Sequence, residues 1–331
     1  MKLTIAEARR YLETIALCAG YASHEAAIIA DHLLDCELRG LAFGGFSRMA
    51  SILERLGDEA PASRPITILT EGPSSAAIDG ADHVGYLVGA RATEIAIEKA
   101  RNTGICVIGA KQTWYTGMFS YYLEKITAAG FVGMVAGSGP PMVAPAGGTE
   151  ARFATNPIAF GFPTTSQPII FDIGTSGVML GELHLKKRLG ELLDPGLAFD
   201  ADGNPTRDPA AALDGGAMTV WGGHKGSGLA LVVQLLGVLA GAASAPEMLR
   251  DCGFFLMALD PEILAGKDYF TTEATRFATS MRATRPIDPA KPVRMPFERS
   301  AAERNTRLSE GTVSVDEEIY AYLEHFRSKR P

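Results

Sequence analysis

The segment at 222–226 has the clearest arrangement of residue types for chemistry. It reads Gly-Gly-His-Lys-Gly, so His224 and Lys225 follow two glycines that leave the backbone free to approach a ligand. Backbone N–H groups and a cation at such a turn together favour a phosphate. A purely structural turn explains the same residues equally well, and the segment alone does not decide between the two interpretations.

A second pair could lie on one helical face. Tyr121 and Lys125 are four residues apart, a spacing that brings a phenol and an ammonium together on a helix. A neighbouring ammonium favours the ionised phenol, as in the short-chain reductases. Those enzymes also carry an N-terminal glycine turn that this chain lacks, so we interpret the pair as a surface contact of the helix.

The common cofactor and hydrolase motifs are absent from the sequence. No Gly-x-Gly-x-x-Gly follows a strand-like segment, and no P-loop, Gly-x-Ser-x-Gly or His-Glu-x-x-His occurs. The sequence therefore does not support a standard dinucleotide-binding turn, a serine-hydrolase elbow or a helical zinc site.

The other histidines and the cysteines form no recognisable cluster. His184 lies in an alternating pattern at 182–186 that is typical of a strand. The four cysteines are far apart and contain no Cys-x-x-Cys, so we expect buried thiols and no metal site. In helical or turn contexts we expect solvated or partly packed rings for His24, His32, His83 and His325.

Length and composition limit the class of protein. The 331 residues are 47% hydrophobic and 21% charged, which allows a large core and one or two domains. The net charge is −7 and no basic run is long enough to follow phosphates, so we expect no nucleic-acid partner. The apolar stretch at 229–241 is too short to span a membrane, and the charged first fifteen residues exclude a signal peptide. We expect a cytoplasmic protein.

Helical and strand patterns alternate along the chain and together predict an α/β fold. Thr4 and Glu7 form a capping-box pattern at the first helix, and Asp79-Gly80 is a turn signal. Helices are expected at 5–39 with a break at Gly20, at 49–56, 84–102 and 121–129, and after Gly228. Strands are expected at 66–69, 76–78, 105–108, 132–135 and 169–172.

Eight short pieces, taken in order over almost the whole chain, carry a resemblance to one family. They are Arg39-Gly40 with Arg48, Asp79-Gly80 with Gly85, Ala100-Arg101 with Gly104, 145–148, 155–157, 171–176, 202–209 and 222–226. The chain thereby resembles the malate/L-lactate dehydrogenase-like oxidoreductases that lack a Rossmann fold. Within that family, 143–149 and 154–161 are most similar to the Δ1-pyrroline-2-carboxylate and Δ1-piperideine-2-carboxylate reductases.

The resemblance implies a particular α/β architecture. The cofactor domain would be a mostly antiparallel, seven-stranded sheet with flanking helices, accompanied by a helical or mixed domain. The boundaries we predict are 111–269 for the NAD(P)H-binding domain, with 1–110 and 270–331 forming a discontinuous substrate-side domain. The resemblance also implies a homodimer.

The resemblance further implies NADPH or NADH as cofactor and a small carboxylate as substrate. Arg48 would hold the carboxylate, because a guanidinium matches it bidentately; the alternative for Arg48 is a surface ion pair. Thr155 and Gly44 would complete the substrate site. The implied cofactor contacts are Tyr115, Thr116, Gly117, Met118, Phe119, Asp172, Ile173, Gly174, His224 and Lys225.

The chain departs from the family at the residues that handle the proton. Relatives carry Ser-His-Gly where this chain has Phe43, Gly44 and Gly45, and a second family histidine aligns with Tyr115. Both usual imidazoles are therefore missing. Tyr115 is then the candidate proton donor, and Glu182 is a second candidate.

A further departure lies near the C-terminus. Relatives often have Pro-Gly-(His)-Glu, and the aligned residues 296–299 read Pro-Phe-Glu-Arg. Arg299 is therefore a candidate for a contact with a cofactor 2′-phosphate.

The lost histidines bear on the substrate. A preformed iminium already carries its proton, so its reduction needs less acid catalysis than the reduction of a ketone. We therefore expect an NAD(P)H-dependent reductase of a small carboxylate-bearing cyclic imine or 2-keto acid. The alternatives are a 2-hydroxy-acid dehydrogenase and a catalytically inactive nucleotide-binding homologue.

Overall fold

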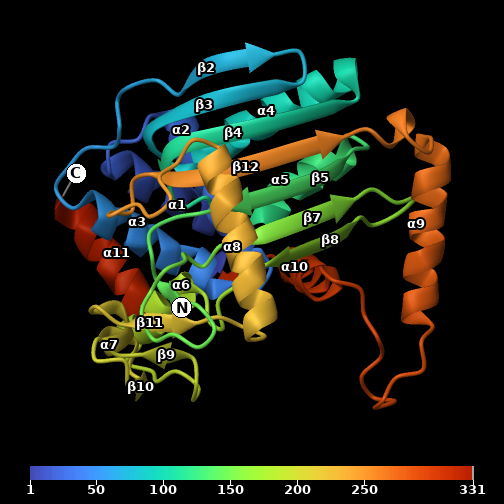
Figure 1. Cartoon of the computed structure of the whole chain (residues 1–331). Coiled ribbons are helices and arrows are strands. Elements are labelled where there is room, and N and C mark those ends of the chain that lie inside the picture. Colours follow the sequence, from blue (N-terminus) through green and yellow to red (C-terminus); the bar gives the residue numbers. More distant parts are fainter. Residues whose placement is uncertain (330–331) are drawn as a thin grey trace.

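The computed structural model describes residues 1–329 and is built around a seven-stranded sheet (Figure 1). Five of its six strand pairings are antiparallel, and the pairing of β3 with β4 is parallel because a helix crosses over between them. The predicted mostly antiparallel sheet is confirmed. In spatial order the strands are β2 (Thr67–Gly72), β3 (Ser75–Val84), β4 (Ile105–Trp114), β12 (Cys252–Leu259), β5 (Val132–Gly137), β7 (Ile158–Phe162) and β8 (Ile169–Ile173).

Helices cover both faces of this sheet. In the central strand β12, Phe254 and Leu256 pack against two helices on one face, whereas Phe255 and Met257 pack against one helix on the other. A strand covered on both faces is expected to be apolar throughout, as this one is. The covering helices are α4 (Gly85–Thr103) and α5 (Phe119–Ala128) on the first face and α8 (His224–Leu239) on the second.

The first and last helices form a second core beside the sheet. The predicted capping box is confirmed, because Glu7 N–H donates to Thr4 Oγ1 at 3.2 Å and Thr4 N–H donates to Glu7 Oε2 at 2.8 Å. Short strands near the two ends of the chain also pair. The elements are β1 (Lys2–Thr4), α1 (Ile5–Cys18), α2 (Ser23–Leu38), η1 (Ala42–Gly44), α3 (Phe46–Leu56), α10 (Glu298–Glu310), β13 (Thr312–Ser314) and α11 (Glu317–Lys329).

A four-stranded sheet and an outlying helix complete the chain. Figure 1 shows α9 beside the large sheet, with a long segment returning from it to α10. No helix in residues 1–329 is long and apolar enough to cross a bilayer. The remaining elements are β6 (Val143–Ala144), α6 (Leu180–Arg188), β9 (Ala198–Phe199), β10 (Pro205–Thr206), α7 (Pro209–Leu213), β11 (Ala217–Thr219), η2 (Pro261–Ile263) and α9 (Lys267–Arg282).

The predicted helices and strands are found within a few residues of their expected positions, with two exceptions. The turn expected at Asp79-Gly80 is wrong: both residues lie inside β3, where the pairing with β4 shifts register and Ala81 and Asp82 have positive φ. The strand expected at 182–186 is also wrong, because these residues lie in α6. There Leu183 packs against a small core, and this tertiary contact overrides the local alternation.

Candidate active site

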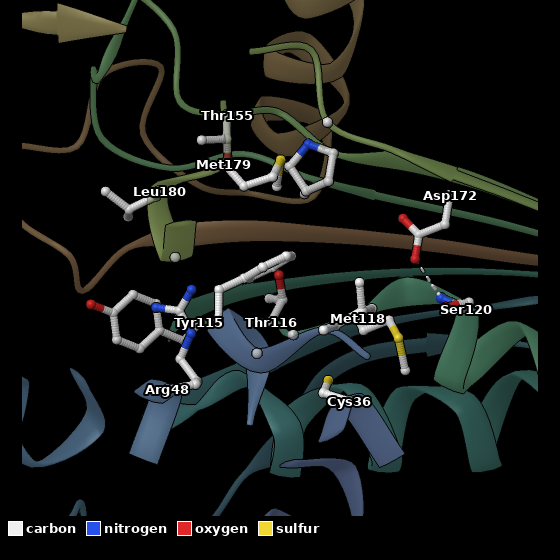
Figure 2. A pocket seen from close by; sticks show the side chains of 18 of the residues that line it. Cys36, Arg48, Tyr115, Thr116, Met118, Ser120, Thr155, Asp172, Met179 and Leu180 are labelled. Carbon is white, nitrogen blue, oxygen red and sulfur yellow. Dashed lines mark hydrogen bonds between the residues drawn. The ribbon is translucent and has the colours of Figure 1, made fainter. Parts of the chain in front are cut away.

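A cavity of about 500 Å³ lies between the large sheet and the N-terminal helices. This volume is in the range of small-molecule sites. Figure 2 shows Arg48 and Tyr115 toward one end and Asp172 with Ser120 toward the other. The cavity therefore has two ends of different chemistry, which we call the arginine end and the aspartate end.

The arginine end holds a cation without an anionic partner. The Cζ of Arg48, on α3, lies 4.2 Å from the centre of the Tyr115 ring. Its Nη1 is buried and has no hydrogen-bond partner, and no ion pair to Arg48 is found within residues 1–329. The surface ion pair, the alternative considered for Arg48, is therefore not observed. Because Arg48 lines the cavity, its charge, which no acidic side chain neutralises in the described chain, favours an anion bound there.

The neighbouring arginines differ from Arg48. Arg55, about two turns further along α3, stacks on Trp114 but also pairs with Asp82 at 3.1 Å. Arg188 pairs with Glu54 at 2.7 Å. Each of these cations is thus neutralised inside the protein.

At the arginine end, part of the cavity surface is formed by Phe43 and Gly44, the residues that stand where the resembled family carries Ser and His. Gly44 and Phe43 both line the cavity beside Cys36 of α2. A Cβ at Gly44 would lie 3.0 Å from the Cys36 Sγ and 3.2 Å from its Cβ. None of the cavity-lining side chains in the described chain is an imidazole. Cys36 thus occupies the space beside position 44, and burial raises the pKa of its thiol well above the ordinary value.

A buried carboxyl group holds the start of α3, next to this part of the cavity surface. Glu37, which is 3% exposed, accepts a hydrogen bond from Phe46 N–H at 2.8 Å, the first residue of α3. A Cβ at Gly45 would lie 2.1 Å from Glu37 Oε1, so only glycine fits there. Burial raises the pKa of Glu37 to about 8, against the lowering effects of the Phe46 amide and Arg307.

The aspartate end is built around the start of α5. Asp172 Oδ2 accepts a hydrogen bond from Ser120 N–H at 2.8 Å, which satisfies an amide in the first turn of the helix. Desolvation inside the cavity raises the pKa of Asp172 to about 6, partly offset by this bond. Gly174 also lines the cavity, and a Cβ added at this position would lie 2.4 Å from Met179 Sδ.

The loop between β4 and α5 joins the two ends. Tyr115, Thr116, Gly117 and Met118 all line the cavity, and Tyr115 and Gly117 have φ values of 49° and 80°. A positive φ at Tyr115 is costly for a non-glycine residue, so the surrounding contacts hold it in place. Tyr122 Oη supports the loop by donating to Thr116 O at 2.9 Å.

The structure brings most of the candidate residues together and leaves five outside. Arg48, Gly44, Thr155 and Arg299 line the cavity, as do the loop residues, Asp172 and Gly174. His224 and Lys225 are exposed at the start of α8. The other candidates that do not line the cavity are Glu182 on α6, Phe119 in the core and Ile173 on β8.

Two further sequence interpretations are settled by contacts. Tyr121 Oη donates to Asp31 Oδ2 at 2.5 Å and receives a bond from Lys125 Nζ at 3.3 Å. Burial and Asp31 raise the pKa of Tyr121, so the pair is not an activated phenol. His32 and His83, expected to be solvated or partly packed, are instead buried, at 1% and 5% exposure.

Sequence reasoning also missed several residues of the site. Cys36 and Cys252 were considered only as core thiols, although both line the cavity. Met179, Leu180 and Ser120 come from unremarkable stretches, and the signal for Cys36 would have been its place on the inward face of α2. No group of three or more potential metal ligands occurs among the residues described.

This architecture agrees with comparisons to known proteins. The model of the malate/L-lactate dehydrogenase family matches residues 3–324. An L-sulfolactate dehydrogenase of Methanothermobacter thermautotrophicus is 32% identical over 294 residues, covering 86% of each chain. A Δ1-pyrroline-2-carboxylate reductase of Pseudomonas fluorescens is 39% identical over 200 residues, covering 56% of this chain and 59% of that protein.

A solved structure of a dehydrogenase from Sinorhizobium meliloti has a TM-score of 0.90 and 28% identity, covering 99% of this chain and 98% of the other. The fold and these matches thus define an oxidoreductase, of a family that implies a nicotinamide cofactor. The chain belongs to the malate/L-lactate dehydrogenase family.

Proposed function

We propose that the protein is an NAD(P)H-dependent reductase of a small cyclic imine that carries a carboxylate. The observation that supports this most is that Arg48 has no ion-pair partner and lines a cavity to which the described residues contribute no imidazole. Arg48 recognises an acid group, and the missing imidazole favours a substrate that brings its own proton.

The substrate is held and oriented at the arginine end. Arg48 binds the carboxylate, and the Tyr115 ring keeps the guanidinium plane in place. Phe43, Leu180 and Cys36 form an apolar wall that excludes water and accepts a hydrocarbon ring. A cyclic imino acid with one carboxylate matches this division between one cation and an apolar wall.

The cofactor residues we propose are the cavity-lining part of the predicted set. The loop 115–118, Asp172 and Gly174 offer backbone close to the cavity, and Gly117 and Gly174 leave no room for a Cβ. When bound, a reduced nicotinamide supplies the hydride. Arg299 is the cavity cation available for a 2′-phosphate, and comparing Kd values for NADPH and NADH in an Arg299→Ala variant tests that role.

Tyr115 donates the proton when the substrate does not already carry it. Burial raises the pKa of Tyr115, although Arg48 opposes the shift, so the phenol stays protonated near neutral pH. A protonated phenol can donate a proton to the substrate but is a poor base. This favours reduction, which needs a proton donor, over oxidation, which needs a base.

The decisive experiment uses the purified protein with each cofactor and Δ1-piperideine-2-carboxylate or Δ1-pyrroline-2-carboxylate. We expect NADPH or NADH to be oxidised in the presence of at least one imine, measured as a fall in the near-ultraviolet absorbance of the cofactor. Lack of turnover with both imines and both cofactors would contradict the proposal. Fluorescence titration of the cofactor distinguishes this failure from an inactive nucleotide-binding homologue, which would still bind.

A 2-hydroxy-acid dehydrogenase is the second candidate. The sulfolactate and malate dehydrogenases that are 31–32% identical to this chain favour it. Under this alternative, pyruvate or oxaloacetate would be reduced with a higher kcat/KM than either imine.

We also propose that the protein is a homodimer. On α8 three leucines one turn apart, Leu231, Leu235 and Leu239, are 50%, 58% and 73% exposed, and Phe277 of α9 is 62% exposed. A contiguous exposed apolar helix face is typical of a protein interface. Light scattering should give a mass of two chains, and Leu235→Glu should shift it toward one.

A further inference from the structure

His32 has contacts that the proposed mechanism does not use. It lies on α2, one helical turn before Cys36, and is 1% exposed. Its ring is 4.4 Å from the Tyr121 ring and 4.6 Å from the Tyr86 ring, measured between centroids. The imidazole therefore lies in an aromatic box behind the cavity.

The ring reaches the cavity through a backbone amide. Met118 N–H donates to His32 Nε2 at 2.9 Å, and Met118 is the last residue of the cavity-lining loop before α5. Next to it, a Cβ at Gly117 would lie 2.5 Å from the same Nε2. His32 is thus in direct contact with the turn at which the loop changes direction.

The protonation state of His32 is set by its surroundings. Burial lowers its pKa to about 3; Lys125 lowers it further, Asp31 opposes the shift, and Arg39 adds the smallest lowering effect. The neutral ring accepts at Nε2, so its proton resides on Nδ1. Nδ1 is buried without a hydrogen-bond partner. A leucine or phenylalanine would avoid this unsatisfied donor, so packing alone does not explain a histidine here.

We infer that His32 is a positioning residue for cofactor binding: its Nε2 fixes the Met118 amide and so holds the 115–118 loop in its binding conformation. This inference rests on the proposed cofactor role of that loop. Three polar contacts then hold the segment. Tyr122 Oη donates to Thr116 O and His32 Nε2 accepts from Met118 N–H, both from outside the cavity, and Asp172 accepts from Ser120 N–H within it.

The experiment compares an acceptor-retaining variant with an acceptor-lacking one. His32→Gln can place an oxygen near the position of Nε2, whereas His32→Leu fills space without an acceptor. We expect His32→Leu to raise the Kd for NADPH about five- to tenfold, the effect of one lost hydrogen bond, and His32→Gln to stay within about threefold of wild type. Cofactor fluorescence gives Kd without requiring turnover.

His83 offers a matched control. It is also buried, its Nε2 lies 2.7 Å from Arg64 O, and it does not line the cavity. His83→Leu should lower Tm as His32→Leu does, yet leave the Kd for NADPH unchanged. If His83→Leu weakens cofactor binding as much as His32→Leu, or if His32→Leu binds normally, the inference is overturned.

Hydrogen exchange separates this inference from the proposed function. In the cofactor-free protein, the Met118 amide should exchange at least fivefold faster in His32→Leu than in wild type or His32→Gln. Unchanged exchange contradicts the positioning role, whether or not the protein binds NADPH or reduces any imine. If His32→Leu does not fold, His32→Asn, whose shorter side chain falls short of the amide, replaces it with the same expected results.

Discussion

The two ends of the cavity are built on different principles. At the aspartate end, Asp172 Oδ2 accepts the hydrogen bond of the Ser120 amide, and Tyr122 holds the loop from outside the cavity. At the arginine end, Arg48 is left without a partner beside an apolar part of the cavity surface. A completed polar network gives a rigid frame, whereas an unsatisfied cation gives affinity for an incoming anion. The comparison separates residues that shape the site from the residue that selects the ligand.

Removing the unpaired cation should have the largest effect. In Arg48→Ala, kcat/KM for a carboxylate substrate should fall about 100-fold or more, because two charge-assisted hydrogen bonds are lost. Steady-state kinetics measure this, while the Kd for NADPH should change little. Arg55→Ala is the matched control, since Arg55 is also stacked on an aromatic ring but is paired with Asp82. Equal losses in the two variants would show that Arg48 acts only through packing.

Restoring the family dyad should have the next largest effect. The triple variant Phe43→Ser, Gly44→His and Cys36→Ala should raise the rate with 2-keto acids about tenfold or more, because a positioned imidazole supplies a proton. Cys36→Ala is needed because a Cβ at 44 would lie 3.0 Å from the sulfur. The same variant with asparagine in place of histidine at 44 is the control. A gain in both would point to cavity size, not acid catalysis.

Tyr115→Phe should distinguish the two kinds of substrate. The ring that stacks on Arg48 remains, so binding of the carboxylate should be retained. Reduction of a 2-keto acid should fall about tenfold or more, while reduction of a cyclic imine should change less than about threefold. Rate measurements with both substrates test this. An equal fall with both would mean that the phenol donates a proton to the imine reaction as well, or positions the substrate.

The last prediction concerns the pH dependence of stability at the arginine end, not the reaction. Folding raises the pKa of Glu37 from 4.5 to about 8, so the folded state binds the proton more tightly than the unfolded state. The stability contributed by the protonated group is complete below about pH 4.5 and is lost as pH rises to about 8, by up to about 1.4 kcal/mol per pH unit.

Urea unfolding at pH 5, 6, 7 and 8 should therefore show a flatter pH dependence for Glu37→Gln than for wild type. Glu150→Gln, at an exposed carboxylate paired with Arg152, serves as the control and should retain the wild-type slope. If Glu37→Gln has the wild-type slope, Glu37 is ionised in the folded protein throughout this range.

Much of the fold follows from local sequence signals, and the exceptions have physical causes. The capping box at Thr4 and the strand expected at 132–135 are properties of neighbouring residues, and they form as expected. The pattern at 182–186 alternates but packs as a helix, because a small core lies on one side of it. The turn signal at Asp79-Gly80 is absorbed by an irregular pairing with β4, a contact between distant segments.

The candidate site residues also fall into two groups, those that the sequence identified correctly as cavity residues and those that it did not. Arg48 and Thr155 could be named from motifs that occur in order along the chain, and the loop 115–118 from what the family resemblance implies. Glu182, His224 and Lys225 were also named, yet none lines the cavity. A motif gives the residue type, and the distance to a cavity depends on how helices α6 and α8 pack.

The sequence alone determined many of the helices and strands, the family resemblance and the loss of both usual imidazoles. Only the tertiary structure decided that Arg48 has no ion-pair partner in the described chain, that Cys36 fills the space beside Gly44, and that His32 reaches the Met118 amide. The physical reason is that periodicity and caps are set by neighbours in the chain, whereas pairing and desolvation are set by residues brought together from distant segments.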